Sequence, residues 1–133
     1  MPRMTIAEIE ALIDQHHADW RTYWEIQHLG ETDITVRMMF RQELLRAGGT
    51  VSGPGMMALA DTAAYFLVLA HVGPTDAATS SLDIHFLTRP QPVDVTATAT
   101  LLRLGSRLAV TTVDLRASNE LVARATVTYA VRP

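Results

Sequence analysis

The sequence predicts an α+β fold in which a curved antiparallel sheet wraps one long central helix, with a second helix at the N-terminus. Two observations carry this prediction. The stretch MMALADTAAYFLVLAH (residues 56–71) is rich in helix formers and apolar on nearly all sides, so it requires burial on most sides. From about residue 79 onward, apolar and polar residues alternate, as they do in strands with one buried face.

Length and composition indicate a single globular domain, which we take to span residues 1–133. Apolar residues make up 48% of the chain and charged residues 19%, which excludes intrinsic disorder and suggests that some apolar surface is buried between subunits. The net charge is -3 without a basic block, so nucleic acid is not an expected partner.

The absence of cysteine excludes disulfides, thiolate metal ligands and a cysteine nucleophile. The N-terminal stretch MPRMTIAEIEALIDQ lacks the long apolar core of a signal peptide. The longest apolar run of the chain is interrupted and is expected to be too short to span a membrane. We therefore expect a cytoplasmic protein with no membrane partner.

The N-terminal helix is expected over residues 5 to about 19, because Ile6, Ile9 and Ile13 recur at helical spacing. Thr5 followed by Glu8 has the pattern of a capping box, which satisfies free amides at a helix start. A hairpin of about 23–29 and 33–40 is expected next, because two β-rich halves flank a turn.

Four strands are expected after the central helix, arranged as a meander. Gly73-Pro74 ends the helix, and Gly105-Ser106 and Ser118-Asn119 have the residue types of hairpin turns. The four strands fall in SSLDIHFLTRP, VDVTATATLLRL, RLAVTTVDLRAS and ELVARATVTYAV.

The loop into the central helix is rich in glycine. A residue before proline avoids the helical region and proline favours the first helical position, so Gly53 is expected as the N-cap and Pro54 as the first helical residue. The amides of Gly53 and Gly55 would then be free at the positive end of the helix, where anions bind. A turn that only caps the helix is an equally open alternative.

Asp61 is the candidate catalytic residue. It is a lone carboxylate on a helical face that also carries Met57, Ala64 and Val68, and such a group is costly unless it is paired or functional. The alternative is that Asp61 faces a solvent gap or bonds a backbone amide.

The stretch GGTVSGPGMMALADTAAYF resembles the helix signature of the hot-dog acyl-CoA thioesterases, in the phenylacetate-pathway (PaaI-like) branch. In that signature a His-Gly-Gly turn opens the helix and an acid follows two turns later; here Ser52-Gly53-Pro54 stands at the turn and Asp61 at the acid. SLDIHFLTRP, LLRLGSRLAV and LVARATVTYAV are similar to three strands of the family. The resemblance covers about residues 24–131 and implies the hot-dog fold.

The resemblance also implies roles for individual residues. The Gly53 amide would stabilise the oxyanion of a thioester, and Asp61 would activate water or attack directly. Thr79 matches a position where some members carry a hydroxyl that assists the water. The implied substrate contacts are Ser52, Gly55, Tyr65, Arg89, Arg103 and Arg107, with the arginines as CoA contacts and no cofactor. For Tyr65 a purely core role is an equal alternative, as ordinary surface charge is for each arginine.

Departures from the signature leave two functions open. Ser52 replaces the histidine, Pro54 removes one amide, and Arg46 stands where an asparagine is frequent. We expect an acyl-CoA thioesterase, and the alternative is a non-catalytic protein that binds acyl-CoA or a small ligand. An acyl-CoA hydratase is a weaker alternative for the function, because no Asp-His pair stands at the helix start. Asp83 and His85 share a strand face but offer only two metal ligands, so no metal site is expected.

The spacing between the two principal candidates predicts a shared site. A helix rises about 1.5 Å per residue, so Asp61 lies roughly 12 Å along the axis from Gly53. A reacting carbonyl needs its oxygen donor and its base each about 3 Å away, so one helix cannot supply both. We therefore expect a homo-oligomer, either a two-fold dimer or a dimer of dimers, in which antiparallel helices share each site.

Overall fold

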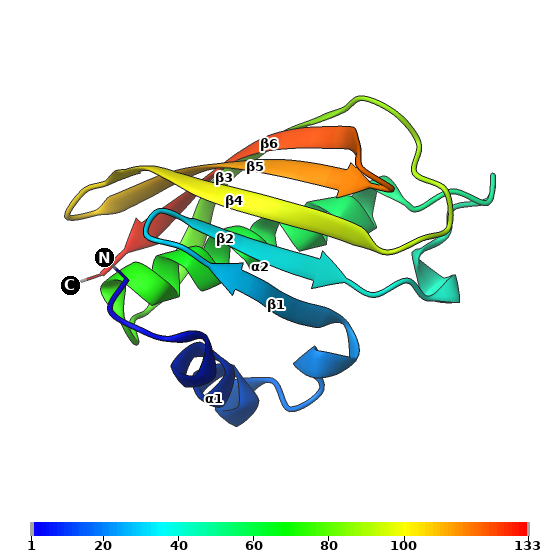
Figure 1. The fold of residues 1–133 in the computed structure, drawn as a ribbon. Helices are drawn as coiled ribbons and strands as arrows, with labels where there is room; N and C mark the ends of the chain where they lie inside the picture. The colour runs from blue at the N-terminus through cyan, green and yellow to red at the C-terminus, as the bar shows by residue number, and fades with distance from the viewer. Residues whose placement is uncertain (1, 133) are drawn as a thin grey trace.

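The computed structural model of this chain describes residues 2–132, which form a six-stranded antiparallel sheet wrapped around a long helix (Figure 1). The helices are α1 (Ile6–His16) and α2 (Gly53–Val72), with 3-10 turns η1 (Trp20–Thr22) and η2 (Gln42–Leu44). The strands are β1 (Trp24–Leu29), β2 (Asp33–Met38), β3 (Ala77–Phe86), β4 (Val95–Leu104), β5 (Leu108–Ala117) and β6 (Glu120–Val131). The predicted α+β hot-dog architecture with an N-terminal helix is confirmed.

The strand order of the sheet is β1-β2-β4-β5-β6-β3. The predicted four-strand meander is therefore wrong in its first strand, because β3 pairs with β6 at the sheet edge while β4 pairs with β2. Pro90 and Pro92 follow β3 and cannot donate ladder hydrogen bonds, so the chain leaves the sheet there and crosses to the other side of the β5–β6 hairpin. The alternation of residues predicted strands with one buried face, but not which strands are neighbours.

The short turns of the sheet formed as predicted. Ser118 and Asn119 connect β5 to β6 with φ values of 50° and 67°. Two successive positive φ angles are typical of the tight hairpin turns whose twist matches that of the strands, and asparagine tolerates this conformation.

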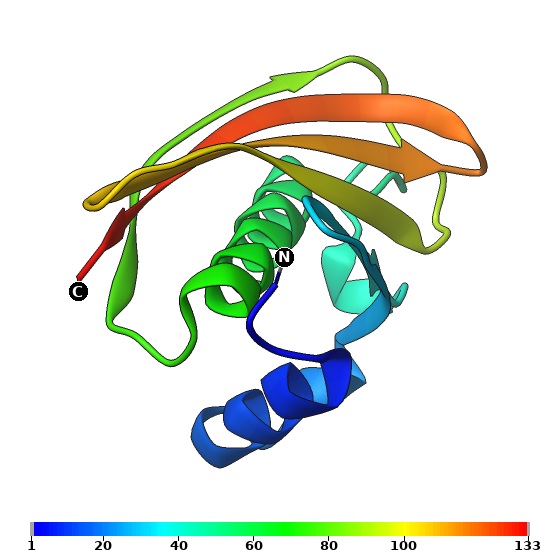
Figure 2. The same ribbon diagram turned by 60° about the vertical axis from the view of Figure 1, so that its left-hand side comes forward.

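Helix α2 lies across the concave face of the sheet (Figures 1 and 2) and packs on β2, β3, β4, β5 and β6. Leu59, Ala63 and Leu67 on its sheet side are fully buried. With 20 residues the helix is long and apolar enough to cross a bilayer, contrary to expectation, but most of it is covered by the rest of this protein. It therefore forms the central layer of the core.

One stripe of α2 is only partly covered by the rest of the chain. Its members recur every three or four residues, so they share one helical face, and each is exposed or half-buried. The stripe consists of Pro54, Met57, Ala58, Asp61, Thr62 and Tyr65. The candidate acid thus lies on a side of the helix that a substrate or a second subunit could reach.

The N-terminal helix ends earlier than predicted. Thr5 and Glu8 close the expected capping box at its start, but the helix stops at His16 rather than near residue 19. The chain then turns through η1 so that the large apolar side chain of Trp20 is buried, edge-on to Phe66 of α2 with ring centroids 5.6 Å apart. Burial of this indole fixes the position of α1 beside α2.

Candidate active site

The carboxylate of Asp61 is held by two hydroxyl groups from different strands. The Tyr129 hydroxyl donates to Oδ1 over 2.7 Å, and the Thr79 hydroxyl donates to the same oxygen over 2.8 Å. No group in residues 2–132 donates a hydrogen bond to Oδ2. Asp61 therefore bonds no backbone amide in this part of the chain, and one of its oxygens is fixed while the other is available.

Tyr129 was missed in the sequence. It occupies the buried face of β6, where the alternation Ala125, Val127, Tyr129 reads as ordinary core. The signal was its hydroxyl, because a buried tyrosine usually finds a partner and Asp61 was the unpaired acid. Burial is the main cause that raises the pKa of Tyr129 far above its usual range, so the residue stays protonated and remains a donor.

Thr79 points at Asp61 because β3 is irregular at that point. Thr79 pairs with Tyr129 and Ser81 with Thr128, so Ser80 is an extra residue that has no partner in the β3–β6 register. Such a bulge changes which face the following side chains point to. It places Thr79 on the inner face beside Tyr129, while Leu82 beyond the bulge still packs inward against the core.

The N-cap of α2 is Ser52, not Gly53. The Ser52 hydroxyl accepts a hydrogen bond from the Gly55 amide over 3.1 Å, and Gly53 and Pro54 are the first two helical residues. The prediction is wrong because a serine hydroxyl can satisfy a first-turn amide and glycine has no side chain to do so. The Gly55 amide is consequently occupied, whereas the Gly53 amide has no hydrogen-bond acceptor within residues 2–132.

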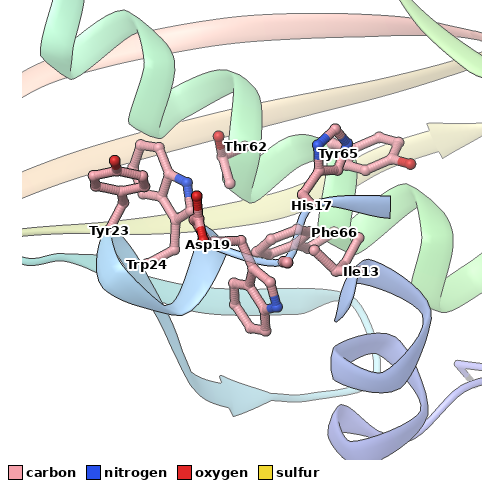
Figure 3. Close-up of a pocket in the computed structure, with 10 residues that line it drawn as sticks. Ile13, His17, Asp19, Tyr23, Trp24, Thr62, Tyr65 and Phe66 are labelled. Carbon is pink, nitrogen blue, oxygen red and sulfur yellow. The ribbon is translucent and has the colours of Figure 1, made fainter. Parts of the chain in front are cut away.

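Tyr65 lies between Tyr129, which bonds Asp61, and a neighbouring pocket. Its ring lies 5.9 Å from the Tyr129 ring and 6.1 Å from the Phe66 ring, measured between centroids. Tyr65 is half-buried, and this burial raises the pKa of its hydroxyl. It also lines a pocket of about 430 Å³ (Figure 3). The residue is thus both a packing side chain and part of a pocket wall.

The three candidate arginines do not converge in one chain. Arg89, Arg103 and Arg107 are all exposed, and none pairs with a carboxylate in the described part of the chain. Arg103 and Arg107 flank the β4–β5 turn, which lies beside His71 at the C-terminal end of α2. Arg89 precedes Pro90, whose carbonyl accepts from the Val51 amide, so it lies near the start of α2.

The histidine and acid on β3 form only a loose pair. His85 and Asp83 approach to 4.0 Å, and both side chains are largely exposed. Within residues 2–132 no group of three histidine, aspartate or glutamate side chains is placed to hold a metal ion.

Comparisons with known proteins give one consistent family. The model of the thioesterase superfamily matches residues 48–124. A solved candidate thioesterase from Silicibacter sp. TM1040 is 35% identical with a TM-score of 0.92, over 100% of this chain and 95% of that one. The PaaI protein of the Escherichia coli phenylacetic acid degradation operon has 19% identity and a TM-score of 0.84, over 96% and 93% of the two chains. A Haemophilus influenzae thioesterase has 24% identity and a TM-score of 0.83, over 96% and 90%. The latter two likenesses bear on the fold alone, and a comparison with curated proteins found no match.

The cap assignment makes a prediction about Ser52. Replacing Ser52 with alanine leaves the Gly55 amide without its acceptor and should lower the free energy of unfolding by about 0.5–2 kcal/mol, measured by urea denaturation. Ser52→Asp keeps an acceptor at the N-cap and serves as the control, with stability close to the wild type. Equal stability of the alanine variant and the wild type would show that Ser52 does not cap α2.

Proposed function

The chain belongs to the thioesterase superfamily, and we propose that it hydrolyses an acyl-CoA thioester to a carboxylic acid and free CoA, with Asp61 as the catalytic carboxylate. Family membership and the 35%-identical candidate thioesterase support hydrolysis of thioesters in general. The observation that carries the finer proposal is the geometry of Asp61, whose Oδ1 is held by Tyr129 and Thr79 while Oδ2 accepts no hydrogen bond from residues 2–132.

In the simplest mechanism Asp61 acts as a general base. Its free oxygen takes a proton from a water molecule as the water oxygen attacks the carbonyl carbon of the thioester. The resulting oxyanion intermediate collapses, the carbon–sulfur bond breaks, and the CoA thiolate receives the proton that Asp61 holds. The products are the carboxylic acid and the thiol of CoA, and the Asp61 carboxylate is regenerated.

A nucleophilic role of Asp61 fits the same geometry. The free oxygen would attack the carbonyl carbon and expel the thiolate, which leaves an acyl anhydride on Asp61 that water then hydrolyses. In both mechanisms the hydroxyls of Tyr129 and Thr79 fix the carboxylate in one orientation before the substrate binds. Fixed orientation lowers the barrier because the reacting atoms are already aligned.

The oxyanion donor in this proposal is the Gly53 amide of a second copy of the chain. This amide has no acceptor within residues 2–132. The Gly55 amide already donates to the Ser52 hydroxyl, and Pro54 has no amide hydrogen to donate. Gly53 and Asp61 of one chain are roughly 12 Å apart along α2, too far to act on one carbonyl.

The geometry of β3 supports a shared site. The strand lies at the sheet edge, so its outer edge has no partner within residues 2–132. Near its start Thr79 bonds Asp61, and at its end the Phe86 ring lies against Gly53, where an added Cβ would be 3.3 Å from that ring. If two copies pair through β3 in antiparallel orientation, Asp61 of each chain lies beside Gly53 of the other. A two-fold dimer then has two equivalent sites.

The arginines supply candidate contacts for the CoA phosphates in this arrangement. Arg89, Arg103 and Arg107 are exposed and have no carboxylate partner in residues 2–132, so their guanidinium groups are available to an anion. Because Arg89 lies near the helix start and the other two at the opposite end of α2, one CoA would meet arginines from different subunits.

The first test replaces Asp61 with asparagine. Thiol release from a panel of aryl and aliphatic acyl-CoAs should fall at least a hundredfold, because the asparagine amide can neither accept the proton from water nor attack the carbonyl. The thermal unfolding midpoint should stay near that of the wild type. Wild-type turnover in this variant would show that Asp61 is structural. Tight CoA binding by the wild type without turnover of any ester would instead support a non-catalytic binding protein.

The second test is complementation between two inactive variants. One parent carries Asp61→Asn and the other carries Gly53→Leu, which blocks the helix start. Mixed dimers made by unfolding and refolding the two together contain one site with an intact Gly53 and an intact Asp61, so activity should return to a fraction of the wild-type level. Mixed dimers that form, as confirmed by tagged purification, and stay inactive would contradict the shared site.

A further inference from the structure

Asp83 and His85 of β3 form a polar pair that has no part in the site described above. Their side chains are 82% and 76% exposed, and Oδ2 of Asp83 lies 4.0 Å from Nε2 of His85. Because side chains alternate along a strand, both point to the outer face of the sheet, while Leu82 and Ile84 pack toward the core. The pair stands beside the open edge of the sheet, since β3 is an edge strand (Figure 2).

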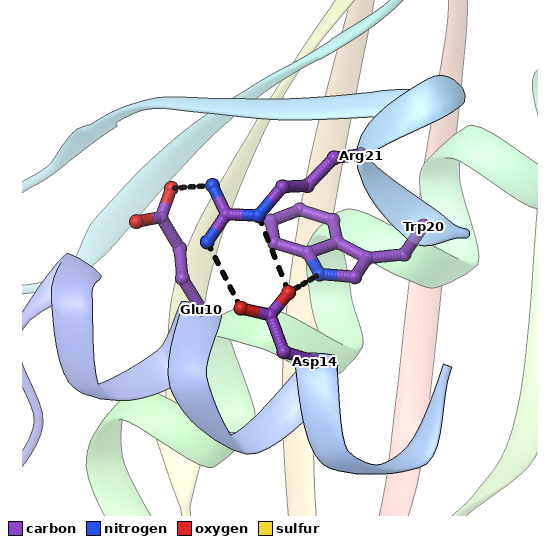
Figure 4. Close-up of polar contacts among 4 residues, drawn as sticks. All are labelled: Glu10, Asp14, Trp20 and Arg21. Atoms are coloured by element: carbon purple, nitrogen blue, oxygen red, sulfur yellow. Dashed lines mark hydrogen bonds and ion pairs between the residues drawn. The ribbon is translucent and has the colours of Figure 1, made fainter. Parts of the chain in front are cut away.

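A charged cluster on α1 shows the contrast with side chains that complete their contacts within one chain (Figure 4). Asp14 accepts hydrogen bonds from the Trp20 indole over 2.7 Å and from Arg21 Nε over 3.2 Å. Arg21 also pairs with Glu10 at 3.5 Å. The side chains of the β3 pair contact no other charged group in residues 2–132, so their ligand atoms are available. One chain, however, offers only two of them.

The proposed pairing of two copies through β3 brings two such pairs together. In an antiparallel pair of strands, residues that are directly opposite point to the same face of the sheet. The two-fold axis therefore passes through a position where a residue is opposite its own copy. In the middle of β3 that residue is Leu82, Asp83 or Ile84.

The register centred on Ile84 fits the side chains of β3 best. It places Ile84 opposite its own copy and Phe86 opposite Leu82, so that the Phe86 ring, which is 47% exposed, gains an apolar neighbour. A register centred on Asp83 places two carboxylates directly opposite each other, which is destabilising. One centred on Leu82 places Phe86 beyond the bulge at Ser80, where the strand is irregular.

This register also agrees with the shared active site. Phe86 lies against Gly53, and in this register it is opposite Leu82 of the second copy. Leu82 is about two residues of rise from Thr79, which bonds Asp61, once the bulged residue is discounted. Two residues of rise span about 7 Å. A carbonyl held about 3 Å from each of two groups requires a separation of roughly 6 Å, so the two lengths agree.

In the same register Asp83 of each copy is opposite His85 of the other. The four side chains start at the corners of a rectangle, about 5 Å between the strands and about 7 Å along each strand. Zn²⁺ takes four nitrogen or oxygen ligands in a tetrahedron at about 2.0–2.2 Å, so two donor atoms on one ion lie roughly 3.4 Å apart. Oδ2 and Nε2 within one chain are already 4.0 Å apart, so small side-chain rotations bring both onto one ion.

The charges around this rectangle suit a divalent cation. Two carboxylates supply two negative charges, and two histidines bind a metal as neutral imidazoles. Arg124 of β6 is opposite His85, but Asp114 accepts a hydrogen bond from its Nε over 2.7 Å, so the positive charge of Arg124 is already compensated.

We propose that Asp83 and His85 of two copies together form a site for a divalent transition-metal ion of the Zn²⁺ type, on the two-fold axis of the dimer. The site is incomplete in one chain, because each copy contributes half of the ligands. The proposal rests on the β3 pairing within the proposed function, and it does not depend on the hydrolytic step.

Co²⁺ absorption tests the site, because four-coordinate Co²⁺ absorbs visible light far more strongly than the six-coordinate aqueous ion. Metal-free protein without a purification tag should develop intense visible bands that saturate at one Co²⁺ per two chains, and Zn²⁺ should bleach them. His85→Ala should weaken Co²⁺ binding at least tenfold. Absence of the bands in the wild type, or saturation at one ion per chain, would overturn the proposal.

His28→Ala is the matched control. His28 of β1 lies 3.9 Å from Asp33 of β2 in a second loose pair, at the opposite edge of the sheet from β3. This variant should bind Co²⁺ as the wild type does. A loss of binding as large as that in His85→Ala would contradict a site on β3.

The metal site and the hydrolytic function fail separately. Asp61→Asn should bind Co²⁺ like the wild type. Saturation at one Co²⁺ per two chains without hydrolysis of any ester would refute the proposed function and leave the metal site intact. Mixed dimers that regain activity in the complementation test, made from a wild-type background that shows no Co²⁺ bands, would refute the metal site alone.

Discussion

Two hydrogen bonds to a single carboxylate oxygen, from Tyr129 and from Thr79 to Asp61, tie together the three elements on which the site depends. A carboxylate on an apolar core helix is costly unless its oxygens are hydrogen-bonded. Here the two hydroxyls offset that cost at Oδ1, and Oδ2 is left without a donor in residues 2–132, as the proposed chemistry requires. Helix α2, strand β3 and strand β6 must all be in place for the arrangement to exist, so the fold and the site are specified by the same contacts.

The position of β3 explains both halves of the proposed site. Because β3 pairs with β6, Thr79 lies directly opposite Tyr129, and a meander with β3 next to β4 would have separated them. The same position leaves β3 at the sheet edge, beside Asp61 near one end and Gly53 at the other. One strand can thus serve as part of the active site and as the surface through which a second chain would complete it.

The sequence predicted features that depend on local patterns and missed those that depend on tertiary pairing. The central helix, the strand faces and the Ser118-Asn119 turn follow from composition, alternation and backbone preference, and Asp61 was conspicuous as a charge in an apolar helix. The place of β3 in the sheet could not be predicted, because alternation carries no information about neighbours. Tyr129 was hidden for the same reason, since its role depends on meeting Asp61, which is 68 residues away in the chain.

The orientation of Asp61 by Tyr129 is the central claim, and the kinetics of Tyr129→Phe test it most directly. This variant keeps the buried ring and removes only the hydroxyl that donates to Oδ1. Loss of one oriented hydrogen bond should lower kcat for acyl-CoA hydrolysis about tenfold or more, which corresponds to about 1.4 kcal/mol, with KM nearly unchanged. A variant that folds and retains kcat within twofold of the wild type would contradict the account.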